Sequence, residues 1–157
     1  MAGKIAPKKA VKPIPDNYHT VTPYLVVPGV ARLIDFLKQT FDAKELVRMP
    51  SPGGGVAHAE IKIGDSMVMM GEPMGQQPTM PAQLYVYVKD VDAVYKKALS
   101  AGGTSVRELA DQFYGDRNGT VQDPCGNHWG IATHKEDVSP EEMKRRMAAM
   151  MQQKASA

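Results

Sequence analysis

Apolar and polar residues follow the same succession of patterns in both halves of the chain. Helical spacing of apolar residues predicts one helix at 30–41 and another that begins after Asp90 and ends at Gly102-Gly103. Strand patterns surround these helices, at 19–27, 44–49, 56–63 and 66–71 in the first half and at 82–88, 104–109 and twice within 114–134 in the second. The order predicts an α+β fold of two β-α-β-β-β modules.

The two halves also align in register, which favours a structural repeat. A shift of 61 positions places Tyr24 on Tyr85, and it places Val30, at the start of the first helix, on Val91. The expected divisions are a disordered basic arm at 1–18, a first module at 19–71, a linker at 72–81, a second module at 82–134 and a C-terminal helix at 135–157. That last helix is predicted from a Ser139-x-x-Glu142 capping box and a stripe of methionines.

The net charge of +2 is located in the arm, since four lysines and one aspartate lie within its first 16 residues. The remainder of the chain is close to neutral, so the charge does not predict nucleic-acid binding. No apolar run approaches the length of a membrane helix, and a soluble cytoplasmic protein is expected. Cys125 is the single cysteine, which excludes an intrachain disulfide and a cysteine-based metal cluster.

Three features together resemble the vicinal oxygen chelate superfamily of glyoxalase I, bleomycin-resistance proteins and extradiol dioxygenases. They are the paired module order, the strand-turn-helix TPYLVVPGVARLIDFLKQTFDA and the hairpin end DPCGNHWGIAT. The resemblance covers about residues 19–134, and the segment HAEIKIGDSMVMM is most similar to the PhnB-like branch of the superfamily. It implies a curled, cup-shaped mixed sheet with the site in its concave interior, and a homodimer whose subunits can exchange modules.

Metal-dependent members of that superfamily hold a divalent ion with His, Gln or Glu side chains at four strand positions. The corresponding positions here are Thr22, Met69, Gln83 and Gly130, and only Gln83 is a credible ligand for such an ion. We therefore expect no metal and no other cofactor. A divalent metal stays possible only in a shifted register that recruits His58, Glu60 or His128.

Strand alternation selects the side chains that should line the cup. The expected lining residues are Tyr24, His58, Glu60, Met67, Met69, Gln83, Tyr85, Tyr87 and His128. Tyr114 and Arg117 lie at its mouth, where Arg117 either binds a ligand carboxylate or phosphate or pairs with its neighbour Asp116. The alternative for the whole set is a solvated sheet face or a subunit contact. Trp129 is expected in the core.

Three functions remain open at this point. The first is a protein that binds a small organic molecule in the cup without a metal. The second is an isomerase, lyase or dioxygenase of the same superfamily, in which His58 and Glu60 act as an acid-base pair on a carbonyl substrate. The third is a structural or docking module that uses the basic arm and the methionine stripe.

Overall fold

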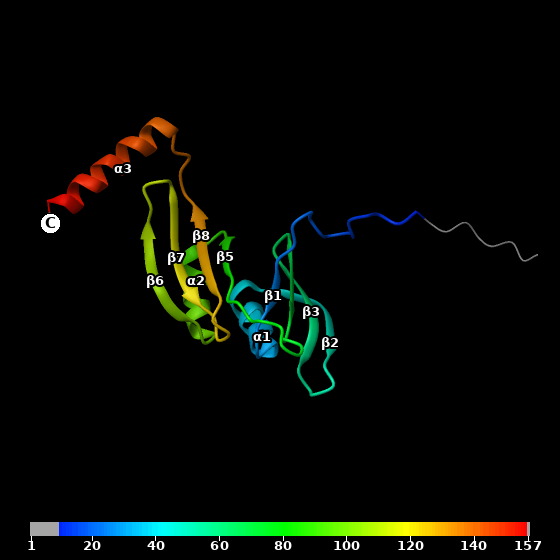
Figure 1. The fold of residues 1–157 in the computed structure, drawn as a ribbon. Coiled ribbons are helices and arrows are strands. Elements are labelled where there is room, and N and C mark those ends of the chain that lie inside the picture. The colour runs from blue at the N-terminus through cyan, green and yellow to red at the C-terminus, as the bar shows by residue number, and fades with distance from the viewer. Residues whose placement is uncertain (1–9, 157) are drawn as a thin grey trace, which may run out of the picture.

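The helices and strands occur in the predicted order in the computed structural model, which describes residues 10–156 (Figure 1). The first module comprises β1 (Tyr24–Val26), α1 (Val30–Phe41), β2 (Lys44–Pro50), β3 (Val56–Ile63) and β4 (Ser66–Gly71). The second comprises β5 (Gln83–Tyr87), α2 (Val91–Ser100), β6 (Thr104–Asp111), β7 (Asp116–Gln122) and β8 (His128–His134). Helix α3 (Pro140–Ala155) follows.

The first strand is shorter than predicted. Only Tyr24–Val26 pairs with β4, whereas His19 to Pro23 lies outside the sheet. Pro23 has no backbone N–H, so it contributes only its carbonyl, which accepts from the backbone N–H of Met69. The β-branched and aromatic residues of this segment therefore predicted a strand but not where it begins.

Each module forms its own four-stranded mixed sheet, with orders β1-β4-β3-β2 and β5-β8-β7-β6. One parallel pair opens each sheet, β1 with β4 and β5 with β8, and the other pairs are antiparallel. The sheets are curled and remain open, which confirms the α+β fold of two β-α-β-β-β modules.

The helices cover the apolar face of each sheet, and this leaves the other face for the site. Leu25 on β1, Ile61 on β3 and Met70 on β4 are almost fully buried beside α1. Asp90 caps α2 by accepting from the backbone N–H of Ala93 at 3.0 Å, as predicted. Trp129 on β8 is 1% exposed, which confirms its expected place in the core.

The two modules meet through their helices. Helix α1 packs against α2, Lys97 pairs with Asp42 at 3.1 Å, and the rings of Phe41 and Trp129 lie 5.5 Å apart. No strand of one sheet pairs with a strand of the other within residues 10–156. The expected cup residues are therefore divided between two separate sheet faces.

The segment at 10–18 and helix α3 extend away from the modules (Figure 1). Ser139 caps α3 by accepting from the backbone N–H of Glu142, as predicted, but the Glu142 carboxylate bonds to Arg145 and Arg146 and does not return to the cap. No residue of α3 is buried. Residues 10–18 hold no helix or strand, and the predicted disorder of residues 1–9 lies outside the described chain.

Candidate functional site

A chain of polar side chains crosses the open face of the first module. Strand register pairs Tyr24 with Met69 and Met69 with Glu60, so these three side chains share a face. The Tyr24 hydroxyl lies 3.2 Å from Nδ1 of His58, and Nε2 of His58 lies 3.2 Å from Oε1 of Glu60. Tyr24 is half exposed, so one end of the chain is open to small molecules.

Glu60 is held as a carboxylate by its surroundings. The Tyr18 hydroxyl is buried beside it, although it lies outside normal hydrogen-bond geometry. Tyr18 and His58 together lower the pKa of Glu60, while burial and the neighbouring carboxylate raise the pKa of Tyr18 to about 12. Glu60 is therefore an acceptor for His58 at neutral pH.

The open face of the second module carries a larger network centred on a buried carboxylate. Asp116 is 5% exposed and accepts from the hydroxyls of Tyr85 at 3.0 Å and Tyr87 at 2.9 Å. Its other oxygen lies 2.8 Å from Nδ1 of His134, whose Nε2 lies 2.8 Å from Asp137. Burial alone would raise the pKa of Asp116, but these hydrogen bonds outweigh it and lower the pKa.

The network also fixes which way the hydroxyl protons point. Asn118 is fully buried and donates from Nδ2 to the hydroxyls of Tyr85 at 2.8 Å and Tyr114 at 2.7 Å. Its Oδ1 accepts from Arg107 and Gln112. Tyr85 must then use its own proton on Asp116, whereas the Tyr114 proton has no acceptor among the described residues. Tyr114 can donate to a bound molecule.

The two faces are related by the repeat. Tyr24 and Glu60 both align with Met69, just as Tyr85 and Thr120 align with Gly130. The hydroxyl contact of Tyr24 with His58 thus corresponds to that of Tyr85 with Asn118. One module places an imidazole at this position and the other an amide.

Comparison with known protein families identifies the superfamily of this chain. A sequence profile described as the Glyoxalase/Bleomycin resistance protein/Dioxygenase superfamily matches residues 18–131. The chain belongs to this superfamily. The matched segment holds both modules except the last three residues of β8, and α3 lies beyond it.

The relatives add sequence and structural likeness. The uncharacterized protein Rv0887c of Mycobacterium tuberculosis is 38% identical over 140 residues, which cover 82% of each chain. TioX from Micromonospora sp. ML1 has a TM-score of 0.63 at 27% identity and covers 73% of this chain and 97% of its own. The PhnB protein from Bacillus cereus has a TM-score of 0.60 at 20% identity, with 73% and 99% covered, which shows a shared fold alone.

Of the four positions at which the resemblance predicts metal ligands, Thr22, Met69 and Gly130 offer no side chain suited to a hard divalent ion. The Thr22 hydroxyl is bound to the carbonyl of His19, and Met69 offers only a thioether. Gly130 has no side chain, and a Cβ built there would lie 2.7 Å from Cδ2 of the Tyr85 ring. The ring of Tyr85 therefore occupies the space that a ligand side chain at this position would need.

The shifted register does not assemble a metal site either. His58 and Glu60 lie on the first sheet, whereas His128 pairs in register with Gln83 on the second. Among residues 10–156, no group of three His, Cys, Asp or Glu side chains is arranged to hold a metal ion.

The remaining candidates are spread over several environments. Met67 is 3% exposed, Met69 and His128 are half-buried, and Gln83 is exposed at the start of β5. Arg117 does not pair with Asp116. Its guanidinium forms two bonds to Asp92 on α2, at 2.8 and 2.9 Å, and it contacts Asp111. A ligand carboxylate would have to displace Asp92 from it.

The turn between β7 and β8 is a structural support for this face. The Asp123 carboxylate, 3% exposed, accepts from the backbone N–H groups of Cys125 and Asn127, the Asn127 side chain and Nε1 of Trp129. Cys125 contacts the carbonyl of Gly29, and burial raises the pKa of its thiol. Asp123 therefore holds the turn in place and anchors Trp129 in the core.

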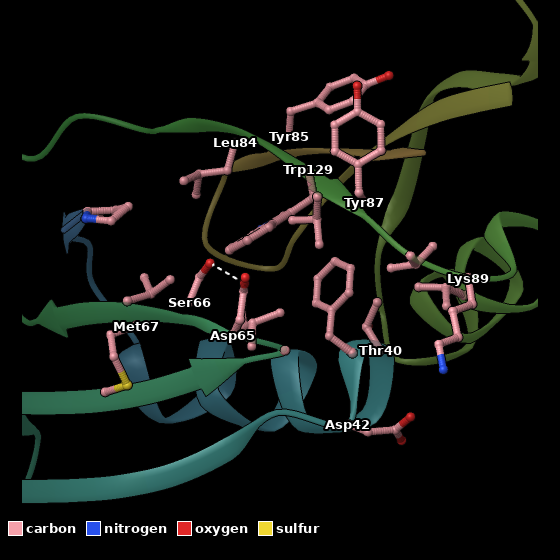
Figure 2. A pocket seen from close by; sticks show the side chains of 18 of the residues that line it. Thr40, Asp42, Asp65, Ser66, Met67, Leu84, Tyr85, Tyr87, Lys89 and Trp129 are labelled. Carbon is pink, nitrogen blue, oxygen red and sulfur yellow. Dashed lines mark hydrogen bonds between the residues drawn. The ribbon is translucent and has the colours of Figure 1, made fainter. Parts of the chain in front are cut away.

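A cavity of about 1120 Å³ lies between the two modules. Figure 2 shows Trp129 and Leu84 on one side, Thr40 on the helix below, and the rings of Tyr85 and Tyr87 on the far side of β5 from Thr40. Met67 also lines it, so three expected cup residues border one space. Sequence reasoning missed Asn118 and His134, although Asp116, Asn118 and Thr120 alternate along β7 and marked a polar face.

Proposed function

We propose that the chain binds a small organic molecule on the open face of the second module without the superfamily's metal ion. One observation carries the proposal: the ring of Tyr85 fills the space above Gly130 while its hydroxyl is held by Asp116 and Asn118. An aromatic ring held in place thus lies where metal-dependent members of the superfamily would carry a metal ligand.

The surrounding groups favour an amphipathic molecule with an aromatic ring and one hydrogen-bond acceptor. The rings of Tyr85 and Tyr87 stack edge to face with centroids 5.2 Å apart, and the two residues are 45% and 62% exposed. Aromatic surfaces with a few oriented polar groups are typical of small-molecule sites. Tyr114 supplies the free donor described above.

A second copy of the chain is the partner that fits this arrangement. The edge strand of each sheet carries exposed apolar side chains, such as Leu46 and Met49 on β2 and Val106 on β6. A homodimer in which the first module of one copy faces the second module of the other would cover both faces and close the cup. A small-molecule ligand would then contact both copies.

Two further parts of the proposal concern the branch of the superfamily and the location of the protein. The shared fold and the segment HAEIKIGDSMVMM support placement in the PhnB-like branch. No helix within residues 10–156 is long and apolar enough to cross a membrane. A cytoplasmic location and the absence of nucleic-acid binding stay predictions.

Thermal shift with a panel of aromatic metabolites and antibiotics tests the binding proposal, with a chelator in every well. We expect at least one compound to raise the unfolding temperature of the wild type, and Tyr85→Ala and Tyr114→Phe to weaken that response. Tyr95→Phe is the matched control because its hydroxyl bonds to Ser105 on the helix-facing side of the sheet. A panel without any stabilising compound, or a response that appears only when a divalent metal replaces the chelator, would contradict the proposal.

A further inference from the structure

The open face of the first module carries an arrangement of polar side chains of its own. Tyr24, His58 and Glu60 form an uninterrupted chain of contacts, with side-chain exposures of 25% for His58 and 24% for Glu60. Tyr24 itself is 50% exposed. A carboxylate lies at the inner end, and a hydroxyl open to solvent lies at the outer end.

The direction of each hydrogen bond follows from the inner end. An ionised Glu60 can only accept, so Nε2 of His58 must carry the proton in the bond between them. In a neutral ring the other nitrogen, Nδ1, is then an acceptor, and the Tyr24 hydroxyl donates to it. The lowered pKa of Glu60 agrees with this assignment.

The position of the Tyr24 hydroxyl requires a glycine at position 71. A Cβ built on Gly71 would lie 3.0 Å from the Tyr24 oxygen and 2.5 Å from the carbonyl oxygen of Ala57. The ring of Tyr24 lies against His58 with centroids 5.7 Å apart. The hydroxyl is thus positioned from both sides and can reach a molecule on the open face.

We propose that Glu60, His58 and Tyr24 form a proton relay, and that Tyr24 is its catalytic end for small carbonyl compounds. The Tyr24 oxygen takes a proton from the carbon beside the carbonyl while its own proton moves to Nδ1 of His58. The electron pair of the broken C–H bond forms the enolate, whose negative charge rests on the carbonyl oxygen. Glu60 stabilises the resulting imidazolium, and the return of a proton to carbon completes the cycle.

The second module provides the comparison that makes this testable. Tyr87 is more exposed than Tyr24, but its hydroxyl donates to Asp116, which raises its pKa. Exposure alone predicts that an acylating reagent modifies Tyr87 first. The relay predicts the reverse, because the imidazole beside Tyr24 is a stronger base than the Asp116 carboxylate beside Tyr87, whose pKa is lowered.

The experiment treats the full-length protein with p-nitrophenyl acetate and measures acetylation of each tyrosine by peptide mass spectrometry. In the reaction the Tyr24 oxygen bonds to the acetyl carbon, p-nitrophenolate leaves, and His58 takes the phenol proton. We expect Tyr24 to react at least about 10-fold faster than Tyr87, with a fall of about 100-fold in His58→Ala, near the lower end of general-base effects.

Several variants separate the relay from a purely structural contact. His58→Gln retains a polar side chain but cannot hold the proton, so it should lose the reactivity as His58→Ala does. Glu60→Gln should lose part of it. His19→Ala, an exposed histidine before β1, is the matched control and should react as the wild type. Equal rates at Tyr24 and Tyr87, or unchanged Tyr24 acetylation in either His58 variant, would overturn the relay.

The substrate class has its own measurement. Proton NMR in D₂O should detect hydrogen exchange in pyruvate or dihydroxyacetone beside the carbonyl, and Tyr24→Phe should abolish it. Selective acetylation without any exchange would overturn the assignment to carbonyl compounds. Because neither measurement requires Tyr85, failure of the binding proposal in the second module leaves this result interpretable on its own.

Discussion

Substitution of Gly130 by alanine probes its contact with the Tyr85 ring, on which the proposed absence of a metal ligand at this position depends. The new Cβ would lie 2.7 Å from Cδ2 of Tyr85, which is a clash, and 3.2 Å from Cε2, which is a tight contact. Either the ring stays in place and the packing around it is strained, or the ring rotates away. Its rotation would break the hydroxyl bonds to Asp116 and Asn118.

Both responses have similar costs. Overpacking of this kind costs about 1–3 kcal/mol, and loss of two hydrogen bonds costs about 1–3 kcal/mol. Gly130 has no left-handed backbone angle, so alanine should also recover about 0.5–1 kcal/mol of strand stability. We therefore expect Gly130→Ala to destabilise the wild type by about 0.5–2 kcal/mol.

A double-mutant cycle separates the clash from other effects. In a Tyr85→Ala background the obstructing ring is absent, so Gly130→Ala should be neutral or stabilise by about 0.5–1 kcal/mol. Urea unfolding followed by Trp129 fluorescence measures all four proteins. Gly53→Ala, where a Cβ meets nothing within 4 Å, should be near neutral in both backgrounds. Equal effects of Gly130→Ala with and without the Tyr85 ring would refute the reasoning.

Three further predictions concern the rest of the chain. Asp123→Ala should lower the free energy of unfolding by about 3 kcal/mol or more in urea titration, because buried donors at its turn lose their acceptor. His134 lies between two carboxylates that raise its pKa, so its stabilising effect should be complete below the ordinary pKa of 6.5 and disappear as pH rises past the raised value. The difference in stability between wild type and His134→Gln, measured from pH 5 to 9, should therefore shrink with rising pH, and a constant difference would contradict this. Removal of residues 139–157 should change the stability by less than about 0.5 kcal/mol, since no residue of α3 is buried and its contacts with the second module are polar ones made by Arg146. A large loss of stability on that deletion would contradict this prediction and show that α3 packs against the modules.

Much of the fold could be predicted from the sequence because each element has a strong local signal. Both helices of the modules begin and end where apolar spacing and turn residues placed them, at Val30–Phe41 and Val91–Ser100. The strands β3 and β4 also match their predicted limits. The first strand was too long because β-branched residues continue beyond the segment that finds a partner.

The site was less accessible to sequence reasoning because its side chains depend on neighbouring strands. Alternation could place Tyr85 and Tyr87 on one face, but only the tertiary structure shows that Asp116 accepts from both. The predicted pairing of Arg117 with Asp116 was wrong, because its partner Asp92 lies on a helix 25 residues away in the chain. The division of the expected cup between two sheets follows from helix packing, which no local pattern reports.

Equilibrium dialysis of the full-length chain against nickel, zinc, iron and manganese tests the central claim most directly. That claim is that a tyrosine ring has replaced the metal position at Gly130 and that ligand binding proceeds without an ion. We predict no stoichiometric uptake of any of the four ions. Tight binding of one ion per chain would contradict the account.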